Sequence, residues 1–339
     1  MKNKICTENI AACIFFIFAF VFPLMSSSYT VDNFSNFYVT VLLSLSLTLI
    51  WGFAGIFSFG QAAFYGLGAY VYGIISIAYD GGNSTIIAAL IAVIISGLFA
   101  ALLASFIFYG KINNIFTGII TMCVATVLET FMTQTSDGKW KVLGVPLGGF
   151  NGLNNIPSLA IGNFDFIGSS FYILVIVVLL IIYLLMRKVQ VSRSGYALFG
   201  IRENQIRSEL FGYNTAKIQT IAFSVSGALA GLAGVLFASW SGYVVPTNFS
   251  VSASTIAVVM VAVAGRKNVT GAMIMTLIYS WFTQFLATTG SEYSQLILGV
   301  LLILVVLFIP DGILVALFKK SDEFFYKLFN TNKKKSLEN

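Results

Sequence analysis

Runs of apolar residues, separated by short polar or glycine-rich stretches, follow one another along most of this chain. Most of them are near the 20 or so residues that an α-helix needs to cross a hydrocarbon core of about 30 Å. The predicted membrane-spanning helices comprise residues 10–25, 37–57, 62–78, 85–109, 112–134, 171–186, 218–243, 253–264, 271–288 and 296–309. The short run 253–264 is expected to be tilted, broken or extended at its N-terminal side. The pattern therefore predicts an all-α, polytopic integral membrane protein with about ten transmembrane helices.

The composition indicates lipid as the surrounding solvent. Hydrophobic residues make up 58% of the 339 residues and charged residues only 9%, whereas a soluble domain carries about a quarter charged residues. The spans are expected to be helical, because unpaired backbone groups are costly in lipid and the alternating pattern of a β-barrel is absent. The run 10–25 follows Lys2 and Lys4 and is compatible with a cleaved signal peptide. We favour a retained first helix, because no A-x-A-like cleavage site follows it.

The basic residues predict the orientation, since Lys and Arg accumulate in cytoplasmic segments. With the N-terminus inside, every Lys and Arg except Lys139 and Lys141 falls in a segment that lies in the cytoplasm. Both termini are therefore predicted to be cytoplasmic. We divide the chain into a transmembrane domain, residues 1–318, and a basic cytoplasmic tail, residues 319–339, that contacts the anionic inner leaflet. Nothing in the sequence supports a nucleic-acid-binding role.

Two loops are too long to be simple connections: an outer loop, residues 135–170, and an inner loop, residues 187–217. In the inner loop Ile206, Leu210 and Tyr213 share one helical face, and Glu203 precedes Arg207 by four residues, the spacing of a favourable ion pair. This pattern predicts a short amphipathic helix along the cytoplasmic face. Such a helix either rests on the bilayer surface or docks a cytoplasmic partner, and periodicity does not separate the two.

Glycines cluster where the second and third spans meet, in the stretch SFGQAAFYGLGAY that begins at Ser58. Glycine permits close helix packing, and it also permits irregular backbone where a cavity is lined. We favour packing; the alternative is a broken or re-entrant element with Ser58 and Gln61 near a solute path. A second set, Gly227 and Gly231 with small residues around them, predicts a helix–helix contact. The candidate path residues are Ser58, Gly60, Gln61, Tyr65 and Glu129.

Glu129 is the one acidic residue well inside a predicted span, which makes it either a functional group or a side chain that reaches interfacial water. The chain has no histidine, which removes the commonest metal ligand and proton shuttle. It has no phosphate-binding loop and no G-x-S-x-G motif, and its three cysteines form no ligand cluster. We therefore expect no catalytic residues, no metal and no cofactor, and a membrane enzyme is disfavoured.

Five segments, in order, resemble one known family: the permease subunits of ABC importers of the branched-chain amino-acid and urea/amide type. GQAAFYGLGAY, from Gly60, is similar to the family's G-H-A-A-F-F-x-x-G-A-Y motif, and SRSGYALFGIRENQIRSELFGYN, from Ser192, to its cytoplasmic coupling segment. IAFSVSGALAGLAGVLFA, GGFNGLNNIP and VAVAGRKNVTGA resemble the following helix, the outer loop and a later inner turn. Gln61 stands where the family commonly has histidine, so any role of that histidine is in doubt here.

The resemblance implies a multi-pass protein of the bacterial plasma membrane that hydrolyses no ATP itself. It implies a second homologous permease chain, two cytoplasmic ABC ATPase subunits and an extracytoplasmic substrate-binding protein, all serving a small polar solute. The residues that couple to the ATPases would be Arg202, Glu203, Asn204, Ile206 and Leu210. The solute expected first is a branched-chain or related small amino acid, with urea or a short amide as the alternative. An ATP-independent facilitator or channel is the alternative from another class.

Overall fold

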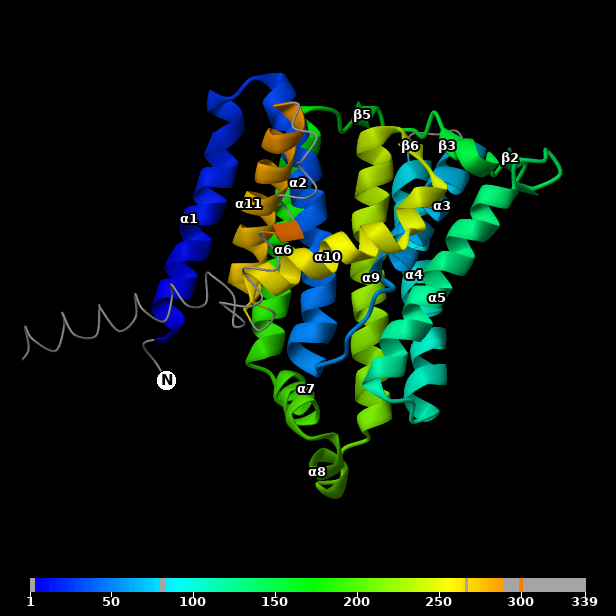
Figure 1. Ribbon diagram of the computed structural model, residues 1–339. Coiled ribbons are helices and arrows are strands. Elements are labelled where there is room, and N and C mark those ends of the chain that lie inside the picture. The colour runs from blue at the N-terminus through cyan, green and yellow to red at the C-terminus, as the bar shows by residue number, and fades with distance from the viewer. Residues whose placement is uncertain (1–3, 80–82, 266–267, 290–298, 301–339) are drawn as a thin grey trace, which may run out of the picture.

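The computed structural model describes residues 4–79, 83–265, 268–289 and 299–300. In this part of the chain eight helices are long and apolar enough to cross a membrane, and a shorter apolar helix accompanies them. The helices, in order, are α1 (Lys4–Met25), α2 (Ser28–Leu47), η1 (Thr48–Ala54), α3 (Gln61–Ala78), α4 (Ser84–Tyr109), α5 (Asn114–Gln134), η2 (Gly149–Asn151), α6 (Ser169–Gln190), α7 (Arg193–Glu203), α8 (Gln205–Leu210), α9 (Thr215–Ser241), η3 (Pro246–Phe249), α10 (Val251–Ala264) and α11 (Val269–Thr288). The prediction of an all-α, polytopic membrane protein is confirmed (Figure 1).

The predicted spans up to residue 288 each correspond to one of these helices, with two differences. The second begins at Ser28, nine residues before the predicted start at Phe37, and its last part, η1, is a π-helix rather than an α-helix. The short eighth span is α10, which Figure 1 shows running across the bundle at a steep angle to its neighbours. The predicted span 296–309 and the tail 319–339 lie outside the described residues, apart from residues 299–300.

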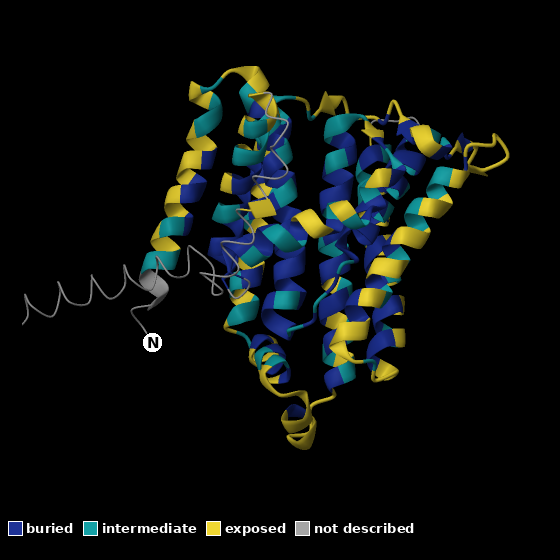
Figure 2. Cartoon of the chain, in the orientation of Figure 1, coloured by how far each residue is buried: buried dark blue, intermediate teal, exposed yellow. Residues whose placement is uncertain are grey.

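Helices α2, α3, α4 and α9 form the packed centre of the bundle. Figure 2 shows buried residues concentrated there, while α1 and α5 carry long exposed stretches. The small-residue face of α9 allows this packing: a side chain on Gly231 would collide with Ser96 of α4, and one on Gly68 of α3 would collide with Gly231. Gly234 likewise packs on the backbone of Tyr65. The predicted helix–helix contact is confirmed, because only glycine lets these backbones approach so closely.

The first helix, α1, packs on α6 and on the start of α11. The hydroxyl of Tyr172 in α6 donates to the backbone carbonyl of Ala19 in α1 (2.8 Å). Near the other end of the same two helices, Arg187 forms an ion pair with Glu8 (2.9 Å). Glu8 also accepts a hydrogen bond from the side chain of Asn268 (2.6 Å). The start of α1, the end of α6 and the start of α11 therefore lie at one end of the bundle.

Six short strands lie in the predicted outer loop and in the turn after α9: β1 (Lys141–Val142), β2 (Val145–Pro146), β3 (Leu153–Asn154), β4 (Ala160–Ile161), β5 (Phe164–Asp165) and β6 (Tyr243–Val244). β1 pairs with β2, β3 with β6, and β4 with β5, all antiparallel. Tyr72 of α3 donates to the carbonyl of Pro157 (2.8 Å), and Ser239 of α9 accepts from the amide of Leu159 (2.8 Å). The loop is thus an ordered cover over one end of the bundle.

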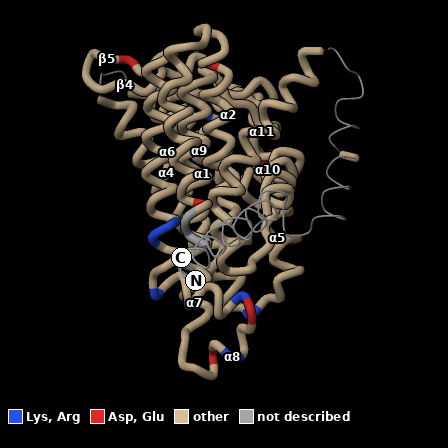
Figure 3. The backbone as a smooth tube through the Cα atoms, turned by 90° about the vertical axis from the view of Figure 1, so that its left-hand side faces the viewer, with Lys and Arg blue, Asp and Glu red and all other residues tan. Residues whose placement is uncertain are grey.

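The opposite end carries α7 and α8, which project beyond the long helices (Figure 1). Most Lys and Arg residues of the described chain gather toward this end in Figure 3. The basic residues from which a cytoplasmic position is predicted thus lie on and around α7 and α8.

Candidate functional site

The chain between α2 and α3 is broken inside the bundle. The π-helix η1 ends at Ala54 and is followed by Gly55, whose φ of +73° is a left-handed conformation that favours glycine. Residues 56–60 are non-helical and run back into the bundle, where α3 begins at Gln61 (Figure 1). The sequence favours packing as the role of the glycines around Ser58 and offers a broken element as the alternative. The structure shows that this region is also a broken element. The sequence did not separate the two roles, because the same glycine pattern is typical of both.

Hydroxyl groups from three parts of the chain satisfy the backbone of this break. Thr121 of α5 accepts from the amide of Phe59 (3.2 Å), and Ser58 accepts from the amide of Gly60 (3.1 Å). Ser254 of α10 accepts from the amide of Ala62 (3.1 Å). Irregular backbone is tolerated at membrane depth only where such partners exist. Thr121 and Ser254 were not identified from the sequence, where they are ordinary hydroxyl residues in apolar helices.

Gln61 lies at the centre of a buried polar network. Its side-chain carbonyl accepts a hydrogen bond from Ser46 of α2 (3.0 Å), and its amide donates to Ser226 of α9 (3.2 Å). Ser226 in turn donates to the backbone carbonyl of Ser46 (2.6 Å). The network joins α2, α3 and α9 through one neutral side chain that both donates and accepts. Gln61 therefore holds the start of α3 in place.

The candidate path residues have different environments. Ser58, Gln61 and Tyr65 are buried, as is Gly60, whose Cα position faces Thr121 of α5. Glu129 is half-buried on α5, and its carboxylate has no ion pair with the residues that the structure describes. The structure therefore brings the first four together at the break and leaves Glu129 apart from them.

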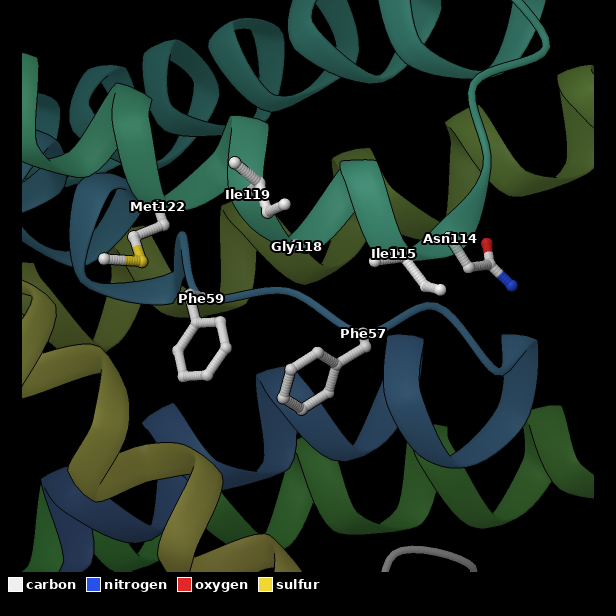
Figure 4. A pocket seen from close by; sticks show the side chains of 7 residues that line it. All are labelled: Phe57, Phe59, Asn114, Ile115, Gly118, Ile119 and Met122. Atoms are coloured by element: carbon white, nitrogen blue, oxygen red, sulfur yellow. The ribbon is translucent and has the colours of Figure 1, made fainter.

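A groove of about 350 Å³ lies between the break and α5. Its lining residues are Phe57, Phe59, Asn114, Ile115, Gly118, Ile119 and Met122 (Figure 4). All are apolar except Asn114, which lies at one end of the row of α5 residues in Figure 4. The sequence pattern indicates Ser58 but not the two phenylalanines on either side of it. Successive side chains of a non-helical segment point in alternate directions, so Phe57 and Phe59 face the groove when Ser58 is buried. This alternation identifies the two phenylalanines once the break is known.

The inner loop forms two helices instead of the single amphipathic helix that we expected. Ser192 caps α7 by accepting from the amide of Gly195 (3.2 Å), and Asn204 caps α8 by accepting from the amide of Arg207 (2.9 Å). Asn204 is extended, with φ −161° and ψ 105°, so the chain turns there. The expected helical pair of Glu203 and Arg207 is consequently split. Asparagine favours a helix start over a helix interior because its side chain competes for backbone amides.

The predicted coupling residues divide between an exposed and an inward-facing group. Ile206 and Leu210 of α8 are 71% and 83% exposed, and Phe211 beside them is 81% exposed. Tyr213 lies beyond the end of α8. Arg202 instead donates from its guanidinium to the backbone carbonyl of Gly52 in η1. Ile206, Leu210 and Phe211, together called the α8 tip below, present an apolar surface at the far end of the molecule.

Within the described residues no group of His, Cys, Asp and Glu side chains is arranged to hold a metal ion.

A protein family described as "Branched-chain amino acid transport system / permease component" matches residues 29–306 of the chain. The high-affinity branched-chain amino acid transport system permease protein LivM of Escherichia coli is 25% identical over 317 residues, which cover 88% of this chain and 73% of LivM. LivH of Escherichia coli is 25% identical over 287 residues, with coverages of 80% and 90%. BraD of Pseudomonas aeruginosa is 26% identical over 292 residues, with the same coverages. No solved structure matches the chain.

Proposed function

The chain belongs to the family of branched-chain amino acid transport system permease components, and from this we propose that it forms the membrane path for branched-chain or related small amino acids. It acts as one transport subunit of an ABC importer, and ATP is hydrolysed by separate subunits. LivM, LivH and BraD are all named as permease proteins of branched-chain amino acid transport. These names support a transport role in place of an enzymatic one.

The observation that carries the substrate assignment is the groove between the break and α5. An aliphatic side chain gains about 25 cal/mol for each Å² of apolar surface removed from water, and the phenyl and isoleucine side chains of this groove offer such surface. Urea has no alkyl group to place there, and a short amide has a smaller one than leucine, isoleucine or valine. The groove therefore favours a branched-chain amino acid.

Glu129 lies on the same face of α5 as Met122, because seven residues correspond to two helical turns, or about 10 Å. Met122 lines the groove, and Glu129 is half-buried farther toward the outer loop. A carboxylate there attracts the ammonium group of an amino acid before its side chain reaches the groove. We therefore place the path along α5, past Phe57 and Phe59, while Ser58 and Gln61 hold the break and the start of α3 in position.

Three kinds of partner complete the proposed importer. A second homologous permease chain covers the exposed face of α5; LivM and LivH are two such permease proteins in one organism, Escherichia coli. The apolar α8 tip docks one of two cytoplasmic ATPase subunits, with Asn204 setting its direction and Glu203 exposed beside it. The ordered outer loop, residues 135–170, receives an extracytoplasmic substrate-binding protein.

The test is uptake of labelled leucine and labelled urea in cells with and without the gene. Ile119→Trp fills the groove and is expected to reduce leucine uptake about tenfold, the scale of a pocket mismatch. The matched control is Ile181→Trp, because Ile119 and Ile181 are each 52% exposed but Ile181 lies on α6, away from the groove. Urea uptake in place of leucine uptake would overturn the assignment of a branched-chain amino acid as the substrate. Uptake that persists without the ATPase subunits would identify a facilitator.

A further inference from the structure

Arg202 stands at the end of α7, next to the residues proposed to dock the ATPase, yet its side chain points into the bundle. The side chain is only 18% exposed, whereas that of the adjacent Glu203 is 70% exposed. One guanidinium nitrogen of Arg202 donates to the backbone carbonyl of Gly52 in η1. Another donates to the carboxylate of Glu203 at 2.9 Å. Arg202 therefore joins the exposed inner loop to the broken helix.

An aromatic contact runs beside this hydrogen bond. The guanidinium carbon of Arg202 lies 5.2 Å from the ring centroid of Phe199 in α7. The ring of Phe199 meets the ring of Phe53 in η1 edge to face, with centroids 5.3 Å apart. Both the cation–π contact and the edge-to-face ring contact are attractive. Two neighbouring residues of η1, Gly52 and Phe53, are thus held by two residues of α7.

The end of η1 needs a partner of this kind. The amides of Gly55 and Ile56 both donate to the carbonyl of Ile50, and the helix ends before its next turn would supply an amide to the Gly52 carbonyl. A positive charge is favourable at a helix C-terminus because of the helix dipole. A side chain at Gly55 would collide with the side-chain carbons of Arg202, so the two residues pack directly on each other.

We propose that Arg202 is a positioning residue that ties the docking helices to the broken helix, so that movement of α7 moves segment 55–60. This rests on the proposed function, in which ATPase subunits act on α8. Phe57 and Phe59, which line the groove, follow Gly52 by only five and seven residues. A displacement of Gly52 is therefore carried into the groove along a short stretch of backbone. Arg202 transmits the movement and does not itself touch the ATPase.

Lysine does not replace arginine in this geometry. The planar guanidinium reaches the Gly52 carbonyl and the Glu203 carboxylate at once while it lies over the Phe199 ring. A lysine ammonium is a compact point charge without a flat face to stack. Arg202→Lys is therefore expected to keep the charge but restore only part of the coupling.

The experiment uses the assembled transporter with its ATPase subunits and binding protein in proteoliposomes. The measured quantities are the ATPase that co-purifies and the number of leucine molecules taken up per ATP hydrolysed. For Arg202→Gln we expect normal co-purification and an uptake per ATP reduced about tenfold, equivalent to about 1.4 kcal/mol. Arg193→Gln is the control: it removes the same charge from the same helix, where Arg193 is exposed.

Each outcome decides whether Arg202 transmits movement from α7 to segment 55–60 or has another role. An unchanged uptake per ATP in Arg202→Gln would overturn the proposal that Arg202 transmits this movement. Loss of ATPase from that variant, with Arg193→Gln normal, would make Arg202 a docking residue and also overturn it. If Arg202→Gln does not fold, Phe53→Leu and Gly55→Ala disturb the same contact from the η1 side and are judged by the same ratio. Wild-type uptake that does not depend on ATP would overturn the proposed function itself.

Discussion

At the scale of single residues, Gln61 shows how a neutral side chain serves at membrane depth. The family motif commonly has histidine at this position, and we left the role of Gln61 in doubt. The structure has the side chain buried between Ser46 and Ser226, donating to one and accepting from the other. An amide does this without a charge, whereas a charged group in the same place would be costly. Gln61 is thus a structural centre of the break.

We expect Gln61→Leu to lower the free energy of unfolding by about 1–3 kcal/mol, because the hydroxyls of Ser46 and Ser226 lose a partner in a buried position. Thermal unfolding in detergent measures the change. Gln134→Leu is the control, since Gln134 is exposed at the end of α5. Equal stability of the two variants would show that the network contributes nothing.

At the scale of elements, local caps decide where the inner helices start. Ser192, Asn204 and Asn214 each accept a hydrogen bond from an amide in the first turn of α7, α8 and α9 respectively. A capping side chain of this kind is worth about 1 kcal/mol. α8 is then tied to the start of α9 through Glu209, whose carboxylate accepts from the Thr215 hydroxyl (2.7 Å) and the Gln205 amide (3.1 Å). These contacts hold the α8 tip in a defined direction.

The hydrogen bonds from Thr215 and Gln205 lower the pKa of Glu209 below its ordinary value of 4.5. Since the folded-state pKa is depressed, the contribution to stability is complete above pH 4.5 and is lost as the pH falls through the folded value. A spin label at Leu210→Cys should therefore become more mobile in that acidic range. Glu209→Gln should abolish this pH response and Glu203→Gln should keep it. A response that survives in Glu209→Gln would exclude Glu209 as its source.

At the scale of the whole molecule, the two ends of the bundle differ in kind. One end is covered by the outer loop, whose strand β3 pairs with β6 after α9. The other end carries α7, α8 and most of the basic residues of the described chain (Figure 3). The bundle thus presents an ordered cap at one membrane surface and a projecting apolar tip at the other.

The sidedness of these ends is tested by labelling single cysteines in a variant whose three native cysteines are serine. We expect Phe150→Cys, on the outer loop, to react with an impermeant maleimide added to intact cells. Leu210→Cys should react only in inverted vesicles, because positive charge predicts that α8 is cytoplasmic. Both positions are highly exposed, at 73% and 83%. Labelling of Leu210→Cys in intact cells would contradict the predicted topology and the ATPase docking with it.

The sequence by itself determined where a helix forms for each span predicted up to residue 288, although not the start of α2 at Ser28, and it determined the small-residue face of α9. These features are local, because hydrophobic length and helical spacing are read from neighbouring residues. Five motifs in the same order along the chain also indicated the family. The helix start at Asn204 is local too, but the spacing of Ile206, Leu210 and Tyr213 predicts one continuous helix, and this prediction is wrong.

Only the tertiary structure decided which polar residues the bundle buries and where the chain breaks. The break depends on partners far away in sequence: Thr121 for Phe59, Ser226 for Gln61 and Ser254 for Ala62, at separations of 62, 165 and 192 residues. The inward direction of Arg202 likewise depends on Gly52, 150 residues away. Backbone left unpaired in lipid must find donors and acceptors wherever the fold brings them. A local sequence pattern does not show which distant residues will be these partners, because the packing of the bundle brings them together.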